Sequence, residues 1–275
     1  MSVKLIVAMC KNNGIGIENK IPWRISEDMN YFSKKTSGLY GTLISSERIK
    51  KNAVIMGRNT WESLPKKYKP LPNRVNIILS KNASTHLHNP NPSLTSSKDV
   101  VFSSSIYDAM DLFYDQGQGQ GQVQLNRCET REKREKIHIN NIWIIGGSSV
   151  YKDFILHDTK NVIQISKYYI TYIDKYYDCD TYFPLIENMN KYYLTRFEKY
   201  KCIDNNTSDK TLVNVYFIVF KKIEYTDEKI IEHLFTSYKS NNETKSHLTL
   251  YVKDIEKIGK NNNNDFEILF SMFSR

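Results

Sequence analysis

Three short apolar stretches of this sequence end in small residues that could bind phosphate groups. Gly57 follows the first stretch, Leu79-Ser80 ends the second, and Gly146-Gly147 follows the third. A glycine lets a ligand approach the backbone closely, and the N–H groups at a helix N-terminus bind anions. Arg58 and Lys81 place a cation beside two of these ends. Together they predict a phosphorylated ligand, although a tight turn or a helix cap would explain any one junction alone.

A single carboxylate, Asp28, stands out because its neighbours are apolar. Ser26 is placed to cap the following helix, which puts Asp28 in the first turn, beside Met29 and one turn before Phe32. A carboxylate among apolar groups is costly unless a cation or a hydrogen-bond donor meets it. The alternative is an exposed acid that complements the helix dipole. The preceding Ile21-Pro22-Trp23 should turn this face toward the sheet, and it favours a ligand-binding role.

Alternating strands and helices are needed to bring these positions together. Short apolar or β-branched runs predict strands, and helical patterns fall between them. The strands are expected at Lys4–Met9, Ala53–Met56, Val75–Leu79, Ile142–Ile145, Ile163–Ile173 and Val213–Lys222, and the helices at Glu27–Thr36, Trp61–Leu64, Ile106–Tyr114 and Val150–Leu156. This order predicts an α/β fold with a central mixed, mostly parallel twisted sheet flanked by helices, in which ligands collect at the strand ends.

Composition narrows the class of protein. With 275 residues, 40% hydrophobic and 25% charged, the chain can bury a sizeable core. The net charge is +9, and because residues 224–275 carry 7 Lys/Arg against 9 Asp/Glu, residues 1–223 hold +11. Such a surplus attracts nucleic acid or a phosphorylated cofactor. A P-loop, a Rossmann fingerprint, a zinc motif and a membrane-length apolar run are all absent from the sequence. The four cysteines form no CxxC pair, which indicates reduced thiols and a cytoplasmic protein.

Two segments interrupt the alternation of strands and helices. Residues 115–136 run from a Gln/Gly repeat into a charge-dense stretch, which is typical of a surface insertion. Residues 224–275 are polar and Asn-rich, which predicts a linker or junction-like tail without a core of its own. We therefore expect one domain over residues 1–223, followed by this tail.

An ordered set of motifs resembles the dihydrofolate reductase family over residues 3–222, the insertion excepted. The matching blocks are residues 6–8, 14–16, 21–23, 28–32, 54–61, 71–80, 142–151 and 180–184. Residues 65–74 and 177–180 look closest to apicomplexan members, where the reductase precedes thymidylate synthase in one bifunctional chain. The resemblance implies NADPH as cofactor, dihydrofolate and antifolate inhibitors as ligands, and hydride transfer to C6 of 7,8-dihydrofolate with protonation at N5.

The resemblance also implies roles for individual residues. Asp28 should hold the pteridine with Thr171 and, through water, Trp23, while Arg74 should bind the glutamate α-carboxylate. Substrate binding is assigned to Val7, Ala8, Ile21, Asp28, Met29, Phe32, Thr60, Leu71, Arg74, Ile145 and Tyr151. Cofactor binding is assigned to Ala8, Ile15, Gly16, Gly57, Arg58, Asn59, Thr60, Leu79, Ser80, Lys81, Gly146, Gly147, Ser148, Ser149, Val150 and Tyr151. The Gly146-Gly147 bond is expected to be cis, and no metal is expected.

Two other functions stay open. One is a reductase of another pteridine or of a riboflavin precursor, which Arg74 opposes because such substrates lack the glutamate tail. The other is a non-catalytic basic nucleotide- or RNA-binding module. The family's autoregulatory RNA contact is compatible with weak RNA binding, but the chain lacks a basic stretch interleaved with aromatic residues. No membrane partner is expected.

The end of the tail leaves a further choice. Residues 264–268 resemble the end of the junction before the synthase in bifunctional relatives. Either the natural chain continues into a fused thymidylate synthase, through which it would dimerise, or the enzyme is monofunctional with a remnant linker.

Overall fold

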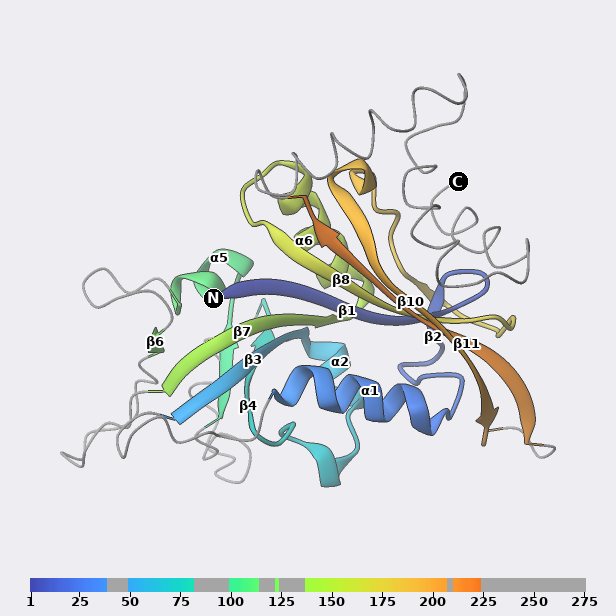
Figure 1. Ribbon diagram of the computed structural model, residues 1–275. Coiled ribbons are helices and arrows are strands. Elements are labelled where there is room, and N and C mark those ends of the chain that lie inside the picture. The colour runs from blue at the N-terminus through green and yellow to red at the C-terminus, as the bar shows by residue number, and fades with distance from the viewer. Residues whose placement is uncertain (39–48, 82–98, 114–121, 124–136, 207–209, 224–275) are drawn as a thin grey trace, which may run out of the picture.

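A computed structural model describes residues 1–38, 49–81, 99–113, 122–123, 137–206 and 210–223. One twisted sheet runs through the molecule in the order β10-β11-β8-β1-β7-β3-β4-β5, and β6 pairs with β7 (Figure 1). Its strands are β1 (Ser2–Cys10), β3 (Ile49–Gly57), β4 (Arg74–Leu79), β5 (Val100–Ser103), β6 (Gln122–Val123), β7 (Ile137–Gly146), β8 (Ile165–Ile173), β10 (Tyr192–Asp204) and β11 (Thr211–Lys222). A small second sheet pairs β2 (Gly14–Gly16) with β9 (Thr181–Tyr182).

The central strands are parallel and the far edge is antiparallel. β1 pairs in parallel with β7 and β8, and the series continues in parallel through β3, β4 and β5. β11 and β10 then extend the sheet in antiparallel pairing. The predicted mixed, mostly parallel α/β fold is confirmed.

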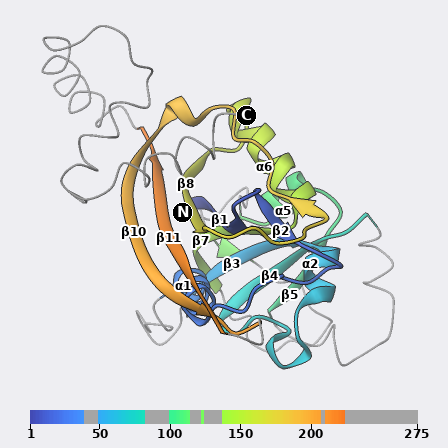
Figure 2. The same ribbon diagram turned by 90° about the vertical axis from the view of Figure 1, so that its right-hand side faces the viewer.

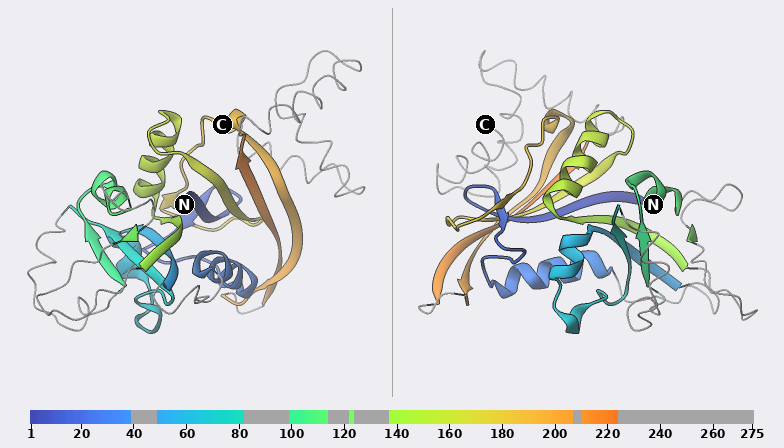
Figure 3. Two further views of the ribbon diagram at one scale, coloured as in Figure 1. Left: turned by 60° about the vertical axis from the view of Figure 1, so that its left-hand side comes forward. Right: turned by 180° about the vertical axis from the view of Figure 1, so that it is seen from behind.

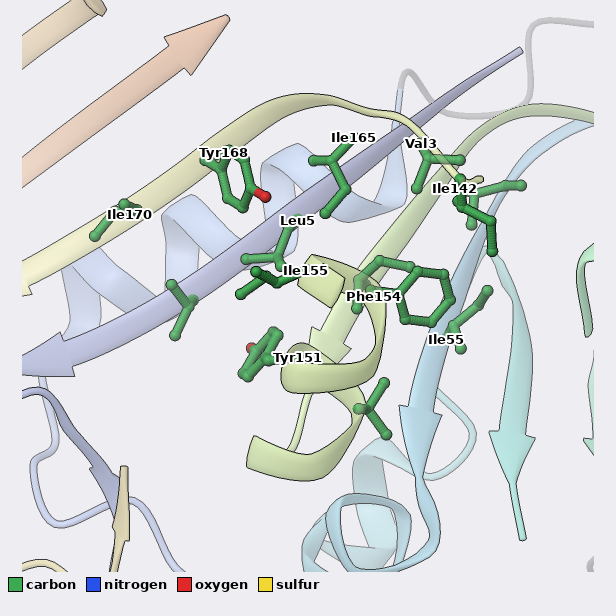
Figure 4. Close-up of a cluster of buried hydrophobic side chains, with 14 of the residues drawn as sticks. Val3, Leu5, Ile55, Ile142, Tyr151, Phe154, Ile155, Ile165, Tyr168 and Ile170 are labelled. Carbon is green, nitrogen blue, oxygen red and sulfur yellow. The ribbon is translucent and has the colours of Figure 1, made fainter. Parts of the chain in front are cut away.

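Helices cover both faces of the central part of this sheet, where most strand residues are buried. The helices are α1 (Ser26–Ser37), α2 (Arg58–Ser63), α5 (Ile106–Asp111) and α6 (Ser148–Thr159), with short turns η1 (Lys66–Tyr68) and η2 (Met189–Lys191). On one face, Phe154 of α6 packs with Leu5, Ile55 and Tyr168 of the sheet (Figure 4). Burial on both faces explains why residues 5–9 of β1 and 142–145 of β7 are continuous apolar runs in the sequence.

The helix starts differ from the expected caps. Ser26 is the first residue of α1 and not its cap; the cap position is Ile25, which makes no side-chain capping bond. Gly57 and Gly147 occupy the cap positions of α2 and α6, again without a side-chain bond. Thr60 and Ser148 therefore do not cap these helices. α5 ends at Asp111, before the expected Tyr114.

The longest strand, β10, was not predicted from the sequence. Its Tyr192–Asp204 segment alternates buried and solvent-facing residues and includes the exposed Thr195, Lys199 and Lys201, so its mean apolarity is low. It pairs with β11 along its length, and the two strands curve past α1 (Figure 2). This curved edge stands apart from the flatter β3-β4-β5 end of the sheet (Figure 3).

Most of the expected insertion and all of the expected tail lie outside the described residues. Of residues 115–136 only Gln122–Val123 is described, as β6 against Ile137 and His138 of β7. Within the described ranges, no helix has the length and apolarity needed to cross a membrane.

Candidate active site

Asp28 is a buried carboxylate at the start of α1. Only 5% of its surface is exposed. Trp23 donates its indole N–H to Asp28 Oδ2 at 3.4 Å, and the Thr171 hydroxyl donates a second hydrogen bond. Burial raises the pKa of Asp28 to about 6, against the opposing effect of these two hydrogen bonds. No ion pair reaches it from the described part of the chain. The carboxylate thus retains capacity to accept hydrogen bonds from a ligand.

Strands of the sheet hold the two hydrogen-bond donors of this carboxylate, Thr171 and Trp23. Thr171 lies opposite Ala8 in the parallel register of β8 and β1. Trp23 is held because the next residue, Arg24, donates its backbone N–H to Asp204 at 2.9 Å. Asp204 is fully buried and also accepts from the Tyr177 hydroxyl at 2.8 Å. Asp204 was not predicted from the sequence, because its partners Arg24 and Tyr177 are far from it along the chain.

Exposed apolar side chains flank the buried carboxylate. Phe32 and Ile145 are half-buried and pack against the same hydrophobic cluster as Leu71. Ile21 and Met29 leave 51% and 49% of their surfaces exposed. Apolar groups exposed around a few polar ones are typical of a site for a flat organic ring.

Arg74 is a buried cation at the start of β4. It is 3% exposed, and its guanidinium lies 5.9 Å from the centre of the Phe32 ring. Nη1 donates to the hydroxyl of Thr36, and Nε donates to the Pro72 carbonyl at 3.0 Å. Burial lowers the pKa of Arg74 to about 10, so it remains charged at neutral pH. Because a guanidinium has five N–H donors, others remain for an anionic ligand.

Asn76, which the sequence reasoning missed, holds the loop that presents Arg74. It is fully buried in β4. Its amide donates to the carbonyls of Leu71 and Arg74 at 3.0 Å each, and its carbonyl accepts from the Leu71 N–H at 3.0 Å. An amide inside the apolar run Val75–Leu79 was the available signal, because a buried amide must be satisfied.

The three strand ends that were predicted to bind phosphate lie side by side. Met56 pairs with Gly146, and Gly57 pairs with Leu79, so the carboxyl ends of β3, β4 and β7 meet at one edge. The Gly146-Gly147 bond is cis, as predicted. Because Gly147 caps α6 without a side-chain bond, the first N–H groups of this helix face the edge without a capping side chain.

Two glycines allow close packing where these strand ends meet α2 and α6. A Cβ at Gly57 would lie 3.1 Å from Val150 Cγ2, and one at Gly147 would lie 3.2 Å from Thr60 Oγ1. Both contacts are tighter than ordinary van der Waals packing, so side chains here would fill the space next to α6. Glycine at these two positions therefore lets the end of β3 approach α6 and the end of β7 approach α2.

The two predicted cations are both exposed beside this edge. Arg58 forms an ion pair with Glu62 at 2.6 Å, one helical turn away, and both side chains are about half exposed. Such exposed pairs contribute little and exchange readily for a stronger anion. Lys81 follows Ser80, whose N–H bonds the Ser103 carbonyl at 2.9 Å. Asn59 and Thr60 lie in α2, next to Arg58.

The remaining predicted residues divide between the edge and the core. Ile15 and Gly16 lie on β2, and Ser148, Ser149 and Val150 begin α6. The Tyr151 hydroxyl donates to the Ile6 carbonyl at 2.7 Å. The Val7 side chain belongs to the core cluster against α6, so only its backbone is available to a ligand.

The segment carrying β2 is held against β9. The Glu18 N–H donates to Asp180 at 2.8 Å, and the Phe183 N–H donates to the Asn13 carbonyl at 2.8 Å. A Cβ at Gly14 would lie 2.4 Å from Cys179 Sγ, so this approach requires glycine. The 180–184 motif therefore positions the segment, a role that the sequence reasoning had not assigned.

Known proteins with similar sequences are dihydrofolate reductases. A family model described as "Dihydrofolate reductase" matches residues 2–113 and 115–222. The dihydrofolate reductase of Heliothis virescens is 33% identical over 225 residues, which are 81% of this chain and 98% of that protein. That of Drosophila melanogaster is 35% identical over 66% of this chain and 79% of its own length. Bifunctional dihydrofolate reductase-thymidylate synthase 2 of Arabidopsis thaliana is 33% identical over 67% of this chain and 26% of its own length.

Proposed function

The chain belongs to the dihydrofolate reductase family, and on that premise we propose which of its residues bind and orient the reactants. Its activity is the NADPH-dependent reduction of dihydrofolate to tetrahydrofolate. The observation that carries the residue assignments is Asp28: a buried carboxylate without an ion pair among the described residues, facing a site lined by exposed apolar groups.

Asp28 binds the pteridine through its 2-amino group and ring N3. Its two hydrogen bonds, from Trp23 and Thr171, fix the carboxylate and leave lone pairs for the ligand. A negative charge in this buried position favours a positively charged ring and so favours protonation at N5 by water. Phe32, Leu71 and Ile145 exclude water from the ring faces.

Arg74 binds the glutamate α-carboxylate of the substrate. Thr36 and Pro72 hold its guanidinium, so little side-chain freedom is lost on binding. This role distinguishes a folate from a pteridine or riboflavin precursor that has no glutamate tail.

The edge formed by Gly57, Gly146-Gly147 and the start of α6 binds NADPH, which supplies the hydride when bound. The α6 N-terminus receives the pyrophosphate, and Arg58 and Lys81 bind the 2′-phosphate. The Lys11 to Lys20 segment covers the nicotinamide side of the site and keeps water out.

One assay tests this function against both alternatives. Loss of nicotinamide absorbance is followed with NADPH and dihydrofolate, with and without methotrexate. We expect turnover that methotrexate abolishes. Turnover only with another pteridine or a riboflavin precursor, or binding without turnover, would contradict the proposal.

We also propose that residues 1–223 form one domain and that the protein is cytoplasmic. The family match ends at residue 222, and the described cysteines Cys10, Cys179 and Cys202 are free thiols, as expected in a reducing compartment. Whether the natural chain is fused to a synthase is decided by sequencing the transcript beyond Arg275.

A further inference from the structure

A group of cations lies on the side of α1 that faces β8, β10 and β11. We call Lys4, Lys35, Lys167 and Arg196 the cationic cluster. Lys35 Nζ lies 5.3 Å from the Tyr31 ring centre and 5.7 Å from that of Tyr169. Arg74 contacts other residues of the same helix, Phe32 and Thr36. Figure 2 shows β10 and β11 curving around this side of the helix.

Sheet register places like charges directly opposite each other in this cluster. Lys4 of β1 pairs with Lys167 of β8, and Lys167 pairs with Lys221 of β11. Opposed like charges in a sheet are destabilising. Burial, and then the charges of Lys167 and Lys35, lower the pKa of Lys4 to about 8. The fold therefore maintains a concentration of positive charge that costs stability when no anion is present.

Carboxylates compensate this charge only in part. Glu198 accepts from Arg196 at 2.7 Å and from the Tyr200 hydroxyl at 2.9 Å. Among the residues that the structure describes, Lys4, Lys35 and Lys167 form no ion pair. The charge of Glu198 also acts on Lys35. The three ammonium groups from α1, β1 and β8 thus share one region in which the described carboxylates form no ion pair with them.

Buried donors without acceptors lie in the same region. The Trp143 indole N–H, the Tyr31 hydroxyl and the Arg196 Nε–H have no hydrogen-bond partner in the described structure. Trp143 is only 3% exposed. Lys4 Nζ lies 5.3 Å from the Trp143 ring, and the Trp143 and Tyr169 rings lie 5.0 Å apart. An unpaired buried donor is costly, and an indole N–H can only donate. The region therefore combines positive charge with unused donors.

We propose that the cationic cluster is an anion site, separate from the reductase site, that binds a phosphate group as the free ion or as a phosphomonoester. A tetrahedral oxyanion offers several acceptors to donors that arrive from different directions, and it carries up to two charges to oppose three ammonium groups. A bound phosphate would link α1 to β1 and β8 and stabilise the folded state in proportion to its occupancy.

The test uses the full chain saturated with NADPH and methotrexate, so that the phosphate-binding groups of the active site are occupied. Melting temperature is measured in sodium phosphate and in sodium chloride at equal ionic strength, and again with adenosine monophosphate. We expect phosphate at ten times its Kd to raise the melting temperature by about 3 °C. An equal response to the nucleotide assigns the site to phosphomonoesters, and a response to phosphate alone assigns it to the free ion.

The double variant Lys4→Gln/Lys167→Gln should lose this response, while Lys152→Gln/Lys160→Gln, two exposed lysines of the α6 region, should retain it. In chloride the first variant should melt at or above the wild-type temperature, because the opposed charges are gone. If the double variant fails to fold, Trp143→Phe is used instead. It keeps an aromatic ring and removes the N–H, and it should weaken the phosphate response.

An undiminished phosphate response in the Lys4/Lys167 and Trp143 variants would overturn the proposal. Dihydrofolate turnover should be unchanged in all of these variants. A missing phosphate response can therefore be distinguished from a wrong assignment of the reductase activity.

Discussion

Two buried aspartates, Asp28 and Asp158, have opposite surroundings. Asp158, at the end of α6, is fully buried and accepts hydrogen bonds from the Tyr192 hydroxyl at 2.7 Å and Asn188 at 3.0 Å. Lys222 reaches the same carboxylate at 3.3 Å. Asp28 has only two side-chain donors, and the Trp23 bond is long at 3.4 Å.

The difference separates a structural carboxylate from a functional one. Asp158 joins α6, β8, β10 and β11, and its lone pairs are occupied by protein donors. Asp28 is also buried, but part of its capacity to accept hydrogen bonds is unused, and a ligand can use that remaining capacity. Burial alone does not identify a site; burial with incomplete pairing does.

The largest effect on folding should come from Asp158→Ala. It leaves Lys222 without its buried partner and removes the acceptor of Tyr192, so we expect the free energy of unfolding to fall by about 3–5 kcal/mol. Urea denaturation measures it, with the exposed Asp153→Ala in the same helix as a control that should change by less than about 0.5 kcal/mol. An equally small loss of unfolding free energy in Asp158→Ala would show that Asp158 does not stabilise the fold.

Asp28→Asn should show the reverse pattern. We expect kcat/KM at pH 7 to fall about 100- to 1000-fold, because the charge that favours the protonated pteridine is lost. The unfolding free energy should not fall. Burial raises the folded pKa of Asp28 from 3.8 to about 6, so the folded state holds its proton to higher pH than the unfolded state. Stability therefore declines as pH rises from about 4 to about 6, by about 3 kcal/mol in total, and the variant lacks this decline. Near-normal turnover with a large loss of stability would show that Asp28 has a structural role and not a catalytic one.

A smaller effect is expected within the active site from Arg74→Ala. Loss of charge-assisted hydrogen bonds should weaken dihydrofolate binding about 10- to 100-fold and leave NADPH binding within about twofold. Arg58→Ala is the matched control, since it should weaken NADPH more than dihydrofolate. Fluorescence titration gives the dissociation constants of both ligands. An equal loss of affinity for dihydrofolate and NADPH in either variant would contradict the assignment of Arg74 to the substrate and Arg58 to the cofactor.

The smallest effect should come from Gly14→Ala, which moves the segment above the site without touching a ligand. The added Cβ would meet Cys179 Sγ at 2.4 Å, so the segment must shift. We expect kcat to fall by less than the roughly 100-fold that a 1 Å misplacement of reacting groups can cost. Cys179→Gly should restore the rate in the double variant. A rate unchanged by Gly14→Ala would show that this approach does not position the segment.

The local sequence predicted the ligand-binding residues better than the residues that hold the fold together. The glycine junctions and Asp28 lie in short patterns that can be recognised one at a time. The partners of Asp158 lie 7 to 64 residues away, so no local pattern marks it. β10 was missed because its exposed face is polar, and Asn76 because an amide in an apolar strand has meaning only once the loop it holds is known.

The central claim is that Asp28 is a buried carboxylate left available for a ligand, and its titration tests this most directly. The Asp28 carboxyl carbon is followed by NMR against pH in the ligand-free protein, assigned by comparison with Asp28→Asn. We predict a pKa near 6, as burial without a cation requires. A pKa at or below about 4, the value of an exposed or ion-paired aspartate, would contradict the account.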